Sequence, residues 1–224
     1  MACSWEYIVH QAECADSSAL LYYVDAPEHT LELRRELEGR PFTTVQLLVP
    51  DWDETLTPWP APKVFAQAER DFGGGARATL GKLLDAMPEI ERELGIQPRT
   101  RLIGGYSLAG LFSLWTFTQA DEFAGCACLS GSLWYDGWLT YLEESEFPAD
   151  GRFAYLSIGK QERFTSNEAM RSGEDCMANS ADLLSLRGVR TTFEVLPGSH
   201  FKKVNARLNT AFDELSSFVK ASCQ

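Results

Sequence analysis

The stretch that decides the fold is Arg101-Leu-Ile-Gly-Gly-Tyr-Ser-Leu-Ala-Gly-Leu-Phe-Ser-Leu-Trp115. Its beginning, Arg101 to Gly104, is a short run typical of a strand, and residues 108–118 are apolar nearly all round, as in a helix buried against a sheet. Ser107 falls in the tight connection between them, with Gly105 two positions earlier. Small residues are needed there because strand and helix approach closely, and the sharp turn strains the serine backbone. The pattern predicts a hydroxyl that projects above the carboxyl ends of the strands.

The rest of the chain alternates short apolar runs with longer helical patterns. Strands are expected at residues 20–24, 43–49, 101–104, 124–129, 153–158 and 191–196, and the first dozen residues can add an antiparallel edge. Helices are expected at residues 28–37, 76–94, 108–118, 169–186 and 206–219, with Pro88 marking a kink or a break; residues 51–62 are expected to be a loop. This alternation predicts an α/β fold: a mostly parallel central sheet with helices on both faces.

Composition bounds the class of protein. A chain of 224 residues, 45% hydrophobic and 23% charged, suits one globular core and excludes a disordered chain or a coiled coil, so we expect a single domain over residues 1–224. Its 32 acidic against 20 basic side chains give a formal charge of −12, which repels phosphate backbones and argues against a nucleic-acid partner. No run approaches ~18 consecutive apolar residues, so no membrane partner is expected.

The six cysteines predict neither a metal site nor another cofactor site. Their spacing fits neither a Cys-x-x-Cys pair nor a Cys/His cluster, and Cys126 and Cys128 fall on one face of an expected buried strand, where a thiol behaves as a small hydrophobe. The N-terminal residues lack the basic segment and apolar stretch of a secretory signal. We therefore expect a reduced, cytoplasmic protein.

The position of the Ser107 hydroxyl suits a nucleophile. A serine nucleophile requires a base, and histidine is the expected one because its pKa lies near neutral pH. Of the three histidines, His10 precedes the core pattern and His29 opens the first expected helix. His200 lies in Leu196-Pro-Gly-Ser-His-Phe201, directly after the last expected strand, where the Pro-Gly turn would direct the ring back over the sheet edge. His200 is therefore the expected base.

The third member should be a carboxylate that orients the imidazole, placed between serine and histidine in the chain. Glu162 comes just after the expected strand at residues 153–158 and is preferred. Glu174 and Asp175 are rivals farther along, and Asp136 is a weaker candidate.

Acyl transfer also needs backbone donors for the developing oxyanion. The N–H of Leu108, immediately after the serine, is the first expected donor. The second should come from the loop after the strand at residues 20–24; Pro27 has no N–H, so Ala26 is expected, with Asp25 as the next choice.

These segments resemble the esterase branch of the α/β-hydrolase superfamily, the group of enterochelin-esterase-like and esterase-D-like enzymes, over most of the chain. The segments that carry the likeness are Leu20-Leu-Tyr-Tyr-Val-Asp25, Gly105-Tyr-Ser-Leu-Ala-Gly-Leu-Phe112, Ser130-Gly-Ser-Leu-Trp134, Ser157-Ile-Gly-Lys-Gln-Glu162 and the histidine loop. The resemblance implies an α/β-hydrolase fold with Ser107, Glu162 and His200 as nucleophile, acid and base. Two departures stand out: Ala109 replaces the usual glycine, and the second-strand loop lacks an arginine often found there.

The segment between the strands ending at residues 129 and 158 is too short for a multi-helix lid, so we expect minimal or no cap. Trp52, Trp59 and Trp134 lie in loops expected on the carboxyl side of the sheet, where such folds bind ligands, and are candidate substrate contacts. Residues 162–177 are polar and are a candidate mobile flap.

The expected activity is that of a serine esterase, a carboxylic-ester hydrolase acting on a small molecule through an acyl-enzyme. Two alternatives stay open: a thioesterase or peptidase with the same three residues, and a catalytically inactive relative that binds a small molecule or a partner.

Overall fold

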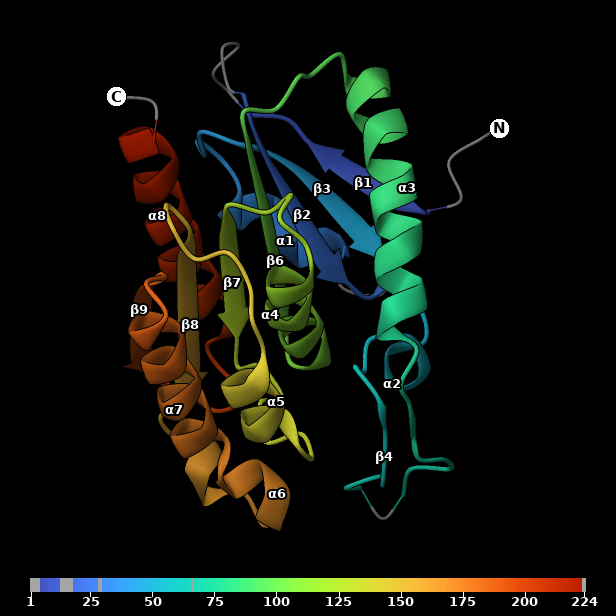
Figure 1. The fold of residues 1–224 in the computed structure, drawn as a ribbon, viewed down its shortest axis with the longest axis vertical. Coiled ribbons are helices and arrows are strands. Elements are labelled where there is room, and N and C mark those ends of the chain that lie inside the picture. The colour runs from blue at the N-terminus through green and yellow to red at the C-terminus, as the bar shows by residue number, and fades with distance from the viewer. Residues whose placement is uncertain (1–4, 13–17, 28–29, 66, 223–224) are drawn as a thin grey trace.

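A seven-stranded sheet forms the centre of the molecule (Figure 1), in a computed structural model that describes residues 5–12, 18–27, 30–65 and 67–222. The strands lie in the order β1-β3-β2-β6-β7-β8-β9. Their bounds are β1 Tyr7–His10, β2 Ala19–Asp25, β3 Thr43–Leu48, β6 Thr100–Tyr106, β7 Gly125–Leu129, β8 Phe153–Gly159 and β9 Arg190–Leu196. All neighbours are parallel except β1, which pairs antiparallel with β3 at the edge, as predicted for the first dozen residues.

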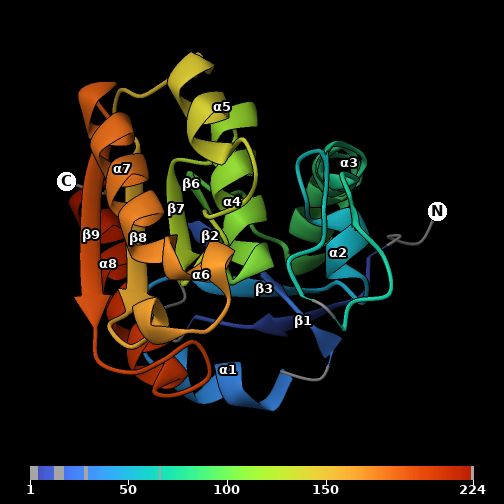
Figure 2. The same cartoon turned by 90° about the horizontal axis from the view of Figure 1, so that it is seen from below.

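Helices cover both faces of the sheet (Figures 1 and 2). One face carries α3 (Ala76–Leu94), α4 (Leu108–Gln119), α5 (Trp138–Glu144) and α7 (Gly173–Leu186), and the other carries α1 (Thr30–Glu36) and α8 (Val204–Ser222). Each face has its own hydrophobic cluster, because successive side chains of a strand point to opposite sides. The predicted α/β class, with a mostly parallel sheet between helices, is confirmed.

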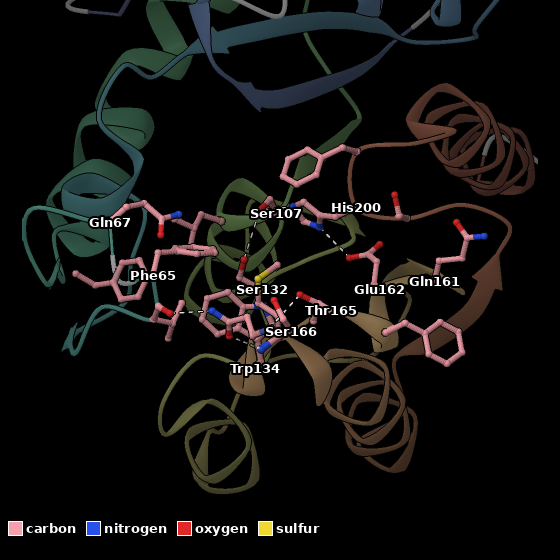
Figure 3. Close-up of a pocket in the computed structure, with 18 residues that line it drawn as sticks. Phe65, Gln67, Ser107, Ser132, Trp134, Gln161, Glu162, Thr165, Ser166 and His200 are labelled. Carbon is pink, nitrogen blue, oxygen red and sulfur yellow. Dashed lines mark hydrogen bonds and ion pairs between the residues drawn. The ribbon is translucent and has the colours of Figure 1, made fainter.

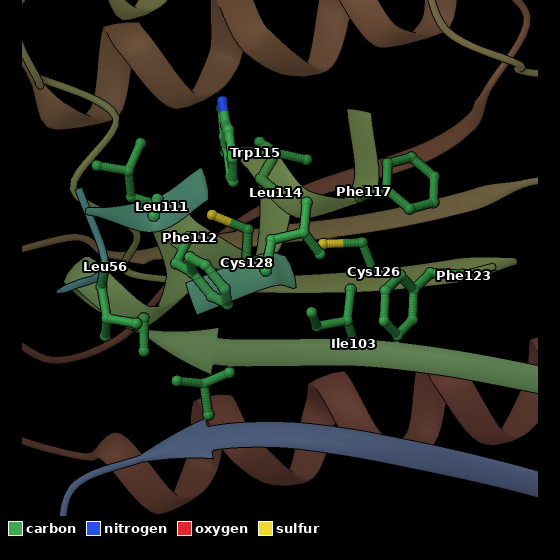
Figure 4. Close-up of a cluster of buried hydrophobic side chains, with 14 of the residues drawn as sticks. Leu56, Ile103, Leu111, Phe112, Leu114, Trp115, Phe117, Phe123, Cys126 and Cys128 are labelled. Atoms are coloured by element: carbon green, nitrogen blue, oxygen red, sulfur yellow. The ribbon is translucent and has the colours of Figure 1, made fainter. Parts of the chain in front are cut away.

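The core around α4 explains why that helix is apolar nearly all round (Figure 4). Every residue from Leu108 to Thr118 is buried, because α4 packs on the sheet on one side and is covered by other elements on the other. Cys126 and Cys128 of β7 point into the same cluster as free thiols, as predicted, and burial raises the pKa of each well above its usual value. These thiols act as packing groups.

The segment expected to be a loop after β3 contains regular structure. It holds α2 (Trp52–Thr55), whose N-cap Asp51 accepts a hydrogen bond from the N–H of Glu54, and the short strands β4 (Pro60–Ala61) and β5 (Phe72–Gly73), which pair antiparallel. We call residues 51–75 the arm. In Figure 1 the arm lies beyond the carboxyl ends of the central strands, on the side of α3.

The helix α3 has the predicted bounds, 76–94, and continues through Pro88 without a break. Pro88 is exposed, and Leu83, Met87 and Ile90 on either side of it are buried in the core. Residues 169–186, expected as one helix, form α6 (Glu168–Arg171) and α7, separated at Ser172. In the described part of the chain, no helix combines the length and apolar character needed to cross a bilayer.

Candidate active site

The turn between β6 and α4 presents Ser107 in a conformation that few L-residues adopt. Its φ is 59° and its ψ is −122°, so the strain expected from the sequence is present. The Ser107 N–H donates to the Leu129 carbonyl at 3.0 Å, and the Ser107 carbonyl accepts from the N–H of Leu111 and Ser132, each at 3.0 Å. These bonds hold the backbone while the hydroxyl remains above the sheet edge.

The small residues beside Ser107 are required by space. A Cβ on Gly105 would lie 2.5 Å from the carbonyl oxygen of Ala109, and one on Gly110 would lie 3.0 Å from the oxygen of Gly105. Ala109 is fully buried, and its own Cβ fits because position 105 has none. The alanine that departs from the usual pattern is therefore compatible with the turn.

Gly105→Ala is expected to destabilise the fold by about 1–3 kcal/mol, the usual cost of overpacking a tight contact. Urea unfolding gives the change in free energy. Gly81→Ala in α3 is the matched control, because a Cβ there meets nothing within 4 Å; it should stabilise the helix by up to about 1 kcal/mol. Equal effects of the two substitutions would contradict the steric reading of the turn.

The structure brings Ser107, His200 and Glu162 together at the carboxyl ends of β6, β9 and β8 (Figure 3). The His200 Nε2 lies 3.1 Å from the Ser107 Oγ, and the His200 Nδ1 lies 2.8 Å from the Glu162 Oε2. Glu162 opens the 3₁₀ turn η2 (Glu162–Phe164) directly after β8. The rival Glu174 instead pairs with Arg163 at the surface.

The second oxygen of Glu162 is held by two donors that sequence reasoning did not find. The Ser130 Oγ donates to Oε1 at 2.7 Å, and the Gly159 N–H donates to it at 2.8 Å. Burial acts to raise the pKa of Glu162, but hydrogen bonding and attraction from His200, together with these two donors, outweigh it and leave the pKa below its usual value. The carboxylate is thus fixed and ionised beside the imidazole.

A buried arginine is hydrogen-bonded to the backbone of the histidine loop. Arg207 of α8 is fully buried and donates from Nη2 to the Tyr106 Oη at 2.6 Å and to the Ser199 carbonyl at 2.7 Å. Tyr106 in turn donates to the His200 carbonyl at 2.6 Å. The residue before the serine is therefore bonded to the backbone of His200, through contacts between residues about a hundred positions apart.

The two expected oxyanion donors differ in availability. Leu108 is the first residue of α4, directly after Ser107, and lines the same cavity, so its N–H stays the first candidate donor. The N–H of Ala26, however, donates to the Asp25 Oδ1 at 2.8 Å, and Asp25 Oδ2 accepts from the Gln46 side chain at 2.9 Å. In this conformation the Ala26 donor is occupied. The Ser132 Oγ, 3.5 Å from the Ser107 Oγ, is a further polar atom at the site.

Two cavities meet at Ser107 and His200. The larger, of about 680 Å³, lies between the arm and the segment 161–171, and its lining residues are Val64, Phe65, Gln67, Phe72, Ser107, Leu108, Ser132, Trp134, Gln161, Glu162, Phe164, Thr165, Ser166, Asn167, Met170, Ser199, His200 and Phe201. The smaller, of about 330 Å³, is lined by Tyr23, Asp25, Leu33, Trp52, Tyr106, Ser107, His200, Phe201, Val204 and Leu208. A ligand bound at Ser107 therefore has room on two sides.

Comparison with known proteins identifies the architecture. No family model matches the chain, and no curated protein matches it. Solved structures do: an IroE-like serine hydrolase from Shewanella oneidensis aligns with a TM-score of 0.74 at 18% identity, over 95% of this chain and 76% of the other. The BES protein from Bacillus cereus aligns at 0.73 and 17%, over 95% and 90%, and the siderophore hydrolase EstB from Aspergillus nidulans at 0.69 and 17%, over 96% and 95%.

The chain has the α/β-hydrolase fold. Within this fold the segment between β7 and β8 contains one described helix, α5, which matches the expectation of a minimal cap. The larger cavity is bounded on two sides by the arm and the segment 161–171. The Asn167 Nδ2 donates to the Val64 carbonyl at 2.7 Å, and this bond joins the segment 161–171 to the arm.

The three tryptophans expected to contact substrate have different positions in this α/β-hydrolase fold. Trp134 lines the larger cavity and Trp52 the smaller. Trp59 lines neither: its Nε1 donates to the Asp136 carbonyl at 2.8 Å and its ring packs on Tyr141, with centroids 5.2 Å apart. Trp59 joins the arm to the rest of the molecule, a role that a loop position in the sequence does not distinguish from ligand contact.

Among the described residues, no group of three or more His, Cys, Asp or Glu side chains is arranged to hold a metal ion. The residues that sequence reasoning missed at this site are mainly supporting ones: Ser130, Ser132, Tyr106 and Arg207. The Ser130-Gly-Ser132 sequence directly after β7 was the available signal for the first two. Arg207 had no signal, since it falls in an amphipathic helix where an arginine is ordinarily solvated.

Proposed function

We propose that this protein is a serine hydrolase that cleaves carboxylic esters of small molecules. The observation that carries the proposal is the continuous hydrogen-bonded arrangement Ser107–His200–Glu162, with distances of 3.1 and 2.8 Å. The names of similar solved structures, a serine hydrolase and a siderophore hydrolase, support it. The proposal includes the expectations of one domain over residues 1–224 and a cytoplasmic location.

In the proposed reaction, the Ser107 Oγ attacks the ester carbonyl carbon while its proton passes to the His200 Nε2. The tetrahedral intermediate collapses as the bond to the alcohol oxygen breaks, and the protonated imidazole gives its proton to the departing alcohol. Water then attacks the acyl-serine, with His200 taking its proton, and the second collapse returns that proton to Ser107 and releases the acid. Glu162 accepts the Nδ1–H throughout and favours the protonated imidazole electrostatically.

The oxyanion that forms in both steps needs preorganised donors. The Leu108 N–H serves as the first. The Ala26 N–H serves as the second if its bond to the Asp25 carboxylate opens when substrate binds, so the donor that sequence reasoning selected requires a local rearrangement.

The direct test is labelling with a fluorophosphonate probe, which modifies an activated serine and leaves an idle one unmodified. Intact-mass analysis of the folded protein should show one adduct, peptide mapping should place it on Ser107, and heat-denatured protein should remain unlabelled. A wild-type protein that stays unlabelled, or an adduct on another serine, would overturn the proposal.

Tyr106→Phe is expected to lower kcat by about 10–100-fold with a smaller effect on KM, because the His200 loop loses the hydroxyl that holds its carbonyl and small displacements of a catalytic group are costly. Burial raises the pKa of Tyr106, so the wild-type phenol is a protonated donor. Tyr155→Phe is the control: that hydroxyl also donates to a distant partner, Glu194 at 2.7 Å, but Tyr155 lines neither cavity. Equal kcat for the two variants would show that the Tyr106 hydroxyl does not position His200.

A further inference from the structure

The larger cavity at Ser107 is rich in aromatic rings and contains little charge. Five of its lining residues are aromatic, namely Phe65, Phe72, Trp134, Phe164 and Phe201, and most of the others carry an amide or a hydroxyl group. The ionisable side chains among the described lining residues are Glu162 and His200, and these are bonded to each other at 2.8 Å. No lysine or arginine belongs to that lining. The cavity thus offers stacking surfaces and neutral hydrogen-bonding groups, without a cation to balance a bound anion.

The aromatic lining continues to the surface of the molecule. Phe65, Phe164 and Phe201 are 38%, 77% and 86% exposed, although phenylalanine is ordinarily buried. All three line the larger cavity, on the arm, on the segment 161–171 and on the histidine loop, and Phe65 is visible at one wall in Figure 3. Exposed apolar groups gathered around one opening indicate a ligand that extends through it.

The lining of the smaller cavity and the net charge of the chain also disfavour a negatively charged ligand. The smaller cavity is lined by aromatic and aliphatic side chains together with the Asp25 carboxylate, and again no lysine or arginine belongs to its described lining. The formal charge of the chain is −12, so the long-range field also repels negatively charged ligands. An anionic ester would lose hydration at this site and would gain no ion pair in return.

We propose that the larger cavity binds an uncharged part of the ester, one that carries aromatic rings and amide or hydroxyl groups, and that esters with an ionised carboxylate in this part are rejected. The rings stack on the phenylalanines and Trp134, while Gln67, Gln161 and the neighbouring hydroxyl groups supply neutral hydrogen bonds. This inference rests on the proposed hydrolase function, and it names the substrate class of that site.

The test compares two substrates that differ in charge at nearly constant shape: the 4-nitrophenyl esters of 4-carbamoylphenylacetic acid and of 4-carboxyphenylacetic acid. The carboxamide should have a kcat/KM about 100-fold higher, because burial of an unpaired carboxylate is costly. The ratio should persist in 0.5 M NaCl, which screens the distant charges but not the desolvation in the cavity. Equal kcat/KM values for the two esters, or a preference for the carboxylate, would overturn the inference.

Gln67→Lys introduces the missing cation at the arm side of the cavity, opposite Gln161 in Figure 3. It is expected to raise kcat/KM for the carboxylate ester about 10-fold and to lower it for the carboxamide ester, since the new charge-assisted contact acts on the carboxylate only and the carboxamide loses the hydrogen bond of the Gln67 amide. Gln97→Lys is the matched control, because Gln97 is exposed and lines neither cavity, and the net charge changes equally. The carboxamide-to-carboxylate ratio of kcat/KM could stay unchanged in Gln67→Lys, or change equally in both variants. Either result would contradict the proposal that the larger cavity binds the part of the ester that carries the carbamoyl or carboxylate group.

The two proposals fail in different ways. If the wild type is labelled by the fluorophosphonate and cleaves 4-nitrophenyl acetate but treats the charged and neutral esters alike, the substrate class is wrong and the hydrolase function stands. If neither labelling nor turnover of any ester occurs, the proposed function itself is wrong.

Discussion

Ser107→Ala is expected to lower kcat/KM for 4-nitrophenyl esters by about 10⁴-fold or more, because no other group can form the acyl-enzyme and only binding and oxyanion contacts remain. The effect should fall on kcat. The Ser107 Oγ is the atom 3.1 Å from the His200 Nε2, and the turn that carries it excludes a larger neighbour at position 105. Stopped assays at high enzyme concentration, with an uncatalysed blank, measure the residual rate.

The control for this variant is Ser113→Ala, on the helix α4 that follows Ser107. Ser113 is also buried, and its hydroxyl donates to the Ala109 carbonyl at 2.7 Å, away from both cavities. Ser113→Ala should keep the wild-type kcat, and the fluorophosphonate should label it as fully as it labels the wild type. If Ser107→Ala retained full turnover of every ester that the wild type cleaves, the hydrolase would use a different nucleophile.

Glu162→Gln should lower kcat by about 10³–10⁴-fold with little change in KM, as expected when an amide replaces the carboxylate that orients a catalytic imidazole. The wild-type carboxylate accepts the His200 Nδ1–H at 2.8 Å. With glutamine, the amide N–H₂ group can face Nδ1 and favour the tautomer that carries its proton on Nε2, which cannot accept the proton of Ser107. Steady-state kinetics across pH 6–9 give kcat and KM separately.

Glu174→Gln is the matched control, because Glu174 was a rival candidate in the sequence and pairs instead with Arg163. Its kcat should stay within about twofold of wild type, since exposed ion pairs contribute little. A large loss of kcat in Glu174→Gln, or a wild-type kcat in Glu162→Gln, would show that Glu162 is not the acid that orients His200.

The depressed pKa of Glu162 also predicts a pH-dependent contribution to stability. The folded pKa lies below the unfolded value of about 4.3, so the stabilising contribution is present above that value and is lost as pH falls through the folded pKa. The difference in unfolding free energy between wild type and Glu162→Gln should therefore narrow as the pH is lowered below about 4.3. Urea unfolding at pH 7 and at successive pH values below 5 measures this difference, and a gap that widened on acidification would contradict the assigned direction.

Much of the fold could be predicted from the sequence, because its determinants are local. The strands are short apolar runs, and the turn at Ser107 requires small neighbours whose spacing is visible in a few residues. The positions of Glu162 and His200 followed from the same reasoning, since parallel strands place the residues after their carboxyl ends at one edge. The structure brings these three side chains together; their catalytic roles stay a prediction.

The contacts that were not predictable join residues far apart in the chain. Nothing local distinguishes Arg207 from a solvated arginine, yet it is buried beneath the histidine loop. The occupied N–H of Ala26 depends on where the Asp25 side chain turns, which a strand pattern does not specify. Trp59 was a candidate substrate contact because a tryptophan in a loop suits both ligand contact and packing. Its contacts with Asp136 and Tyr141, residues far away in the chain, place it outside the two cavities.

The bond between Asn167 and the Val64 carbonyl has a consequence for how this chain can diverge. Ser107, Glu162 and His200 follow strands of the central sheet, whereas the larger cavity is bounded by two peripheral segments that this side-chain amide joins. If the proposed function holds, substitutions in those segments can alter which molecules enter without displacing the three residues. Selectivity and reactivity can then evolve separately.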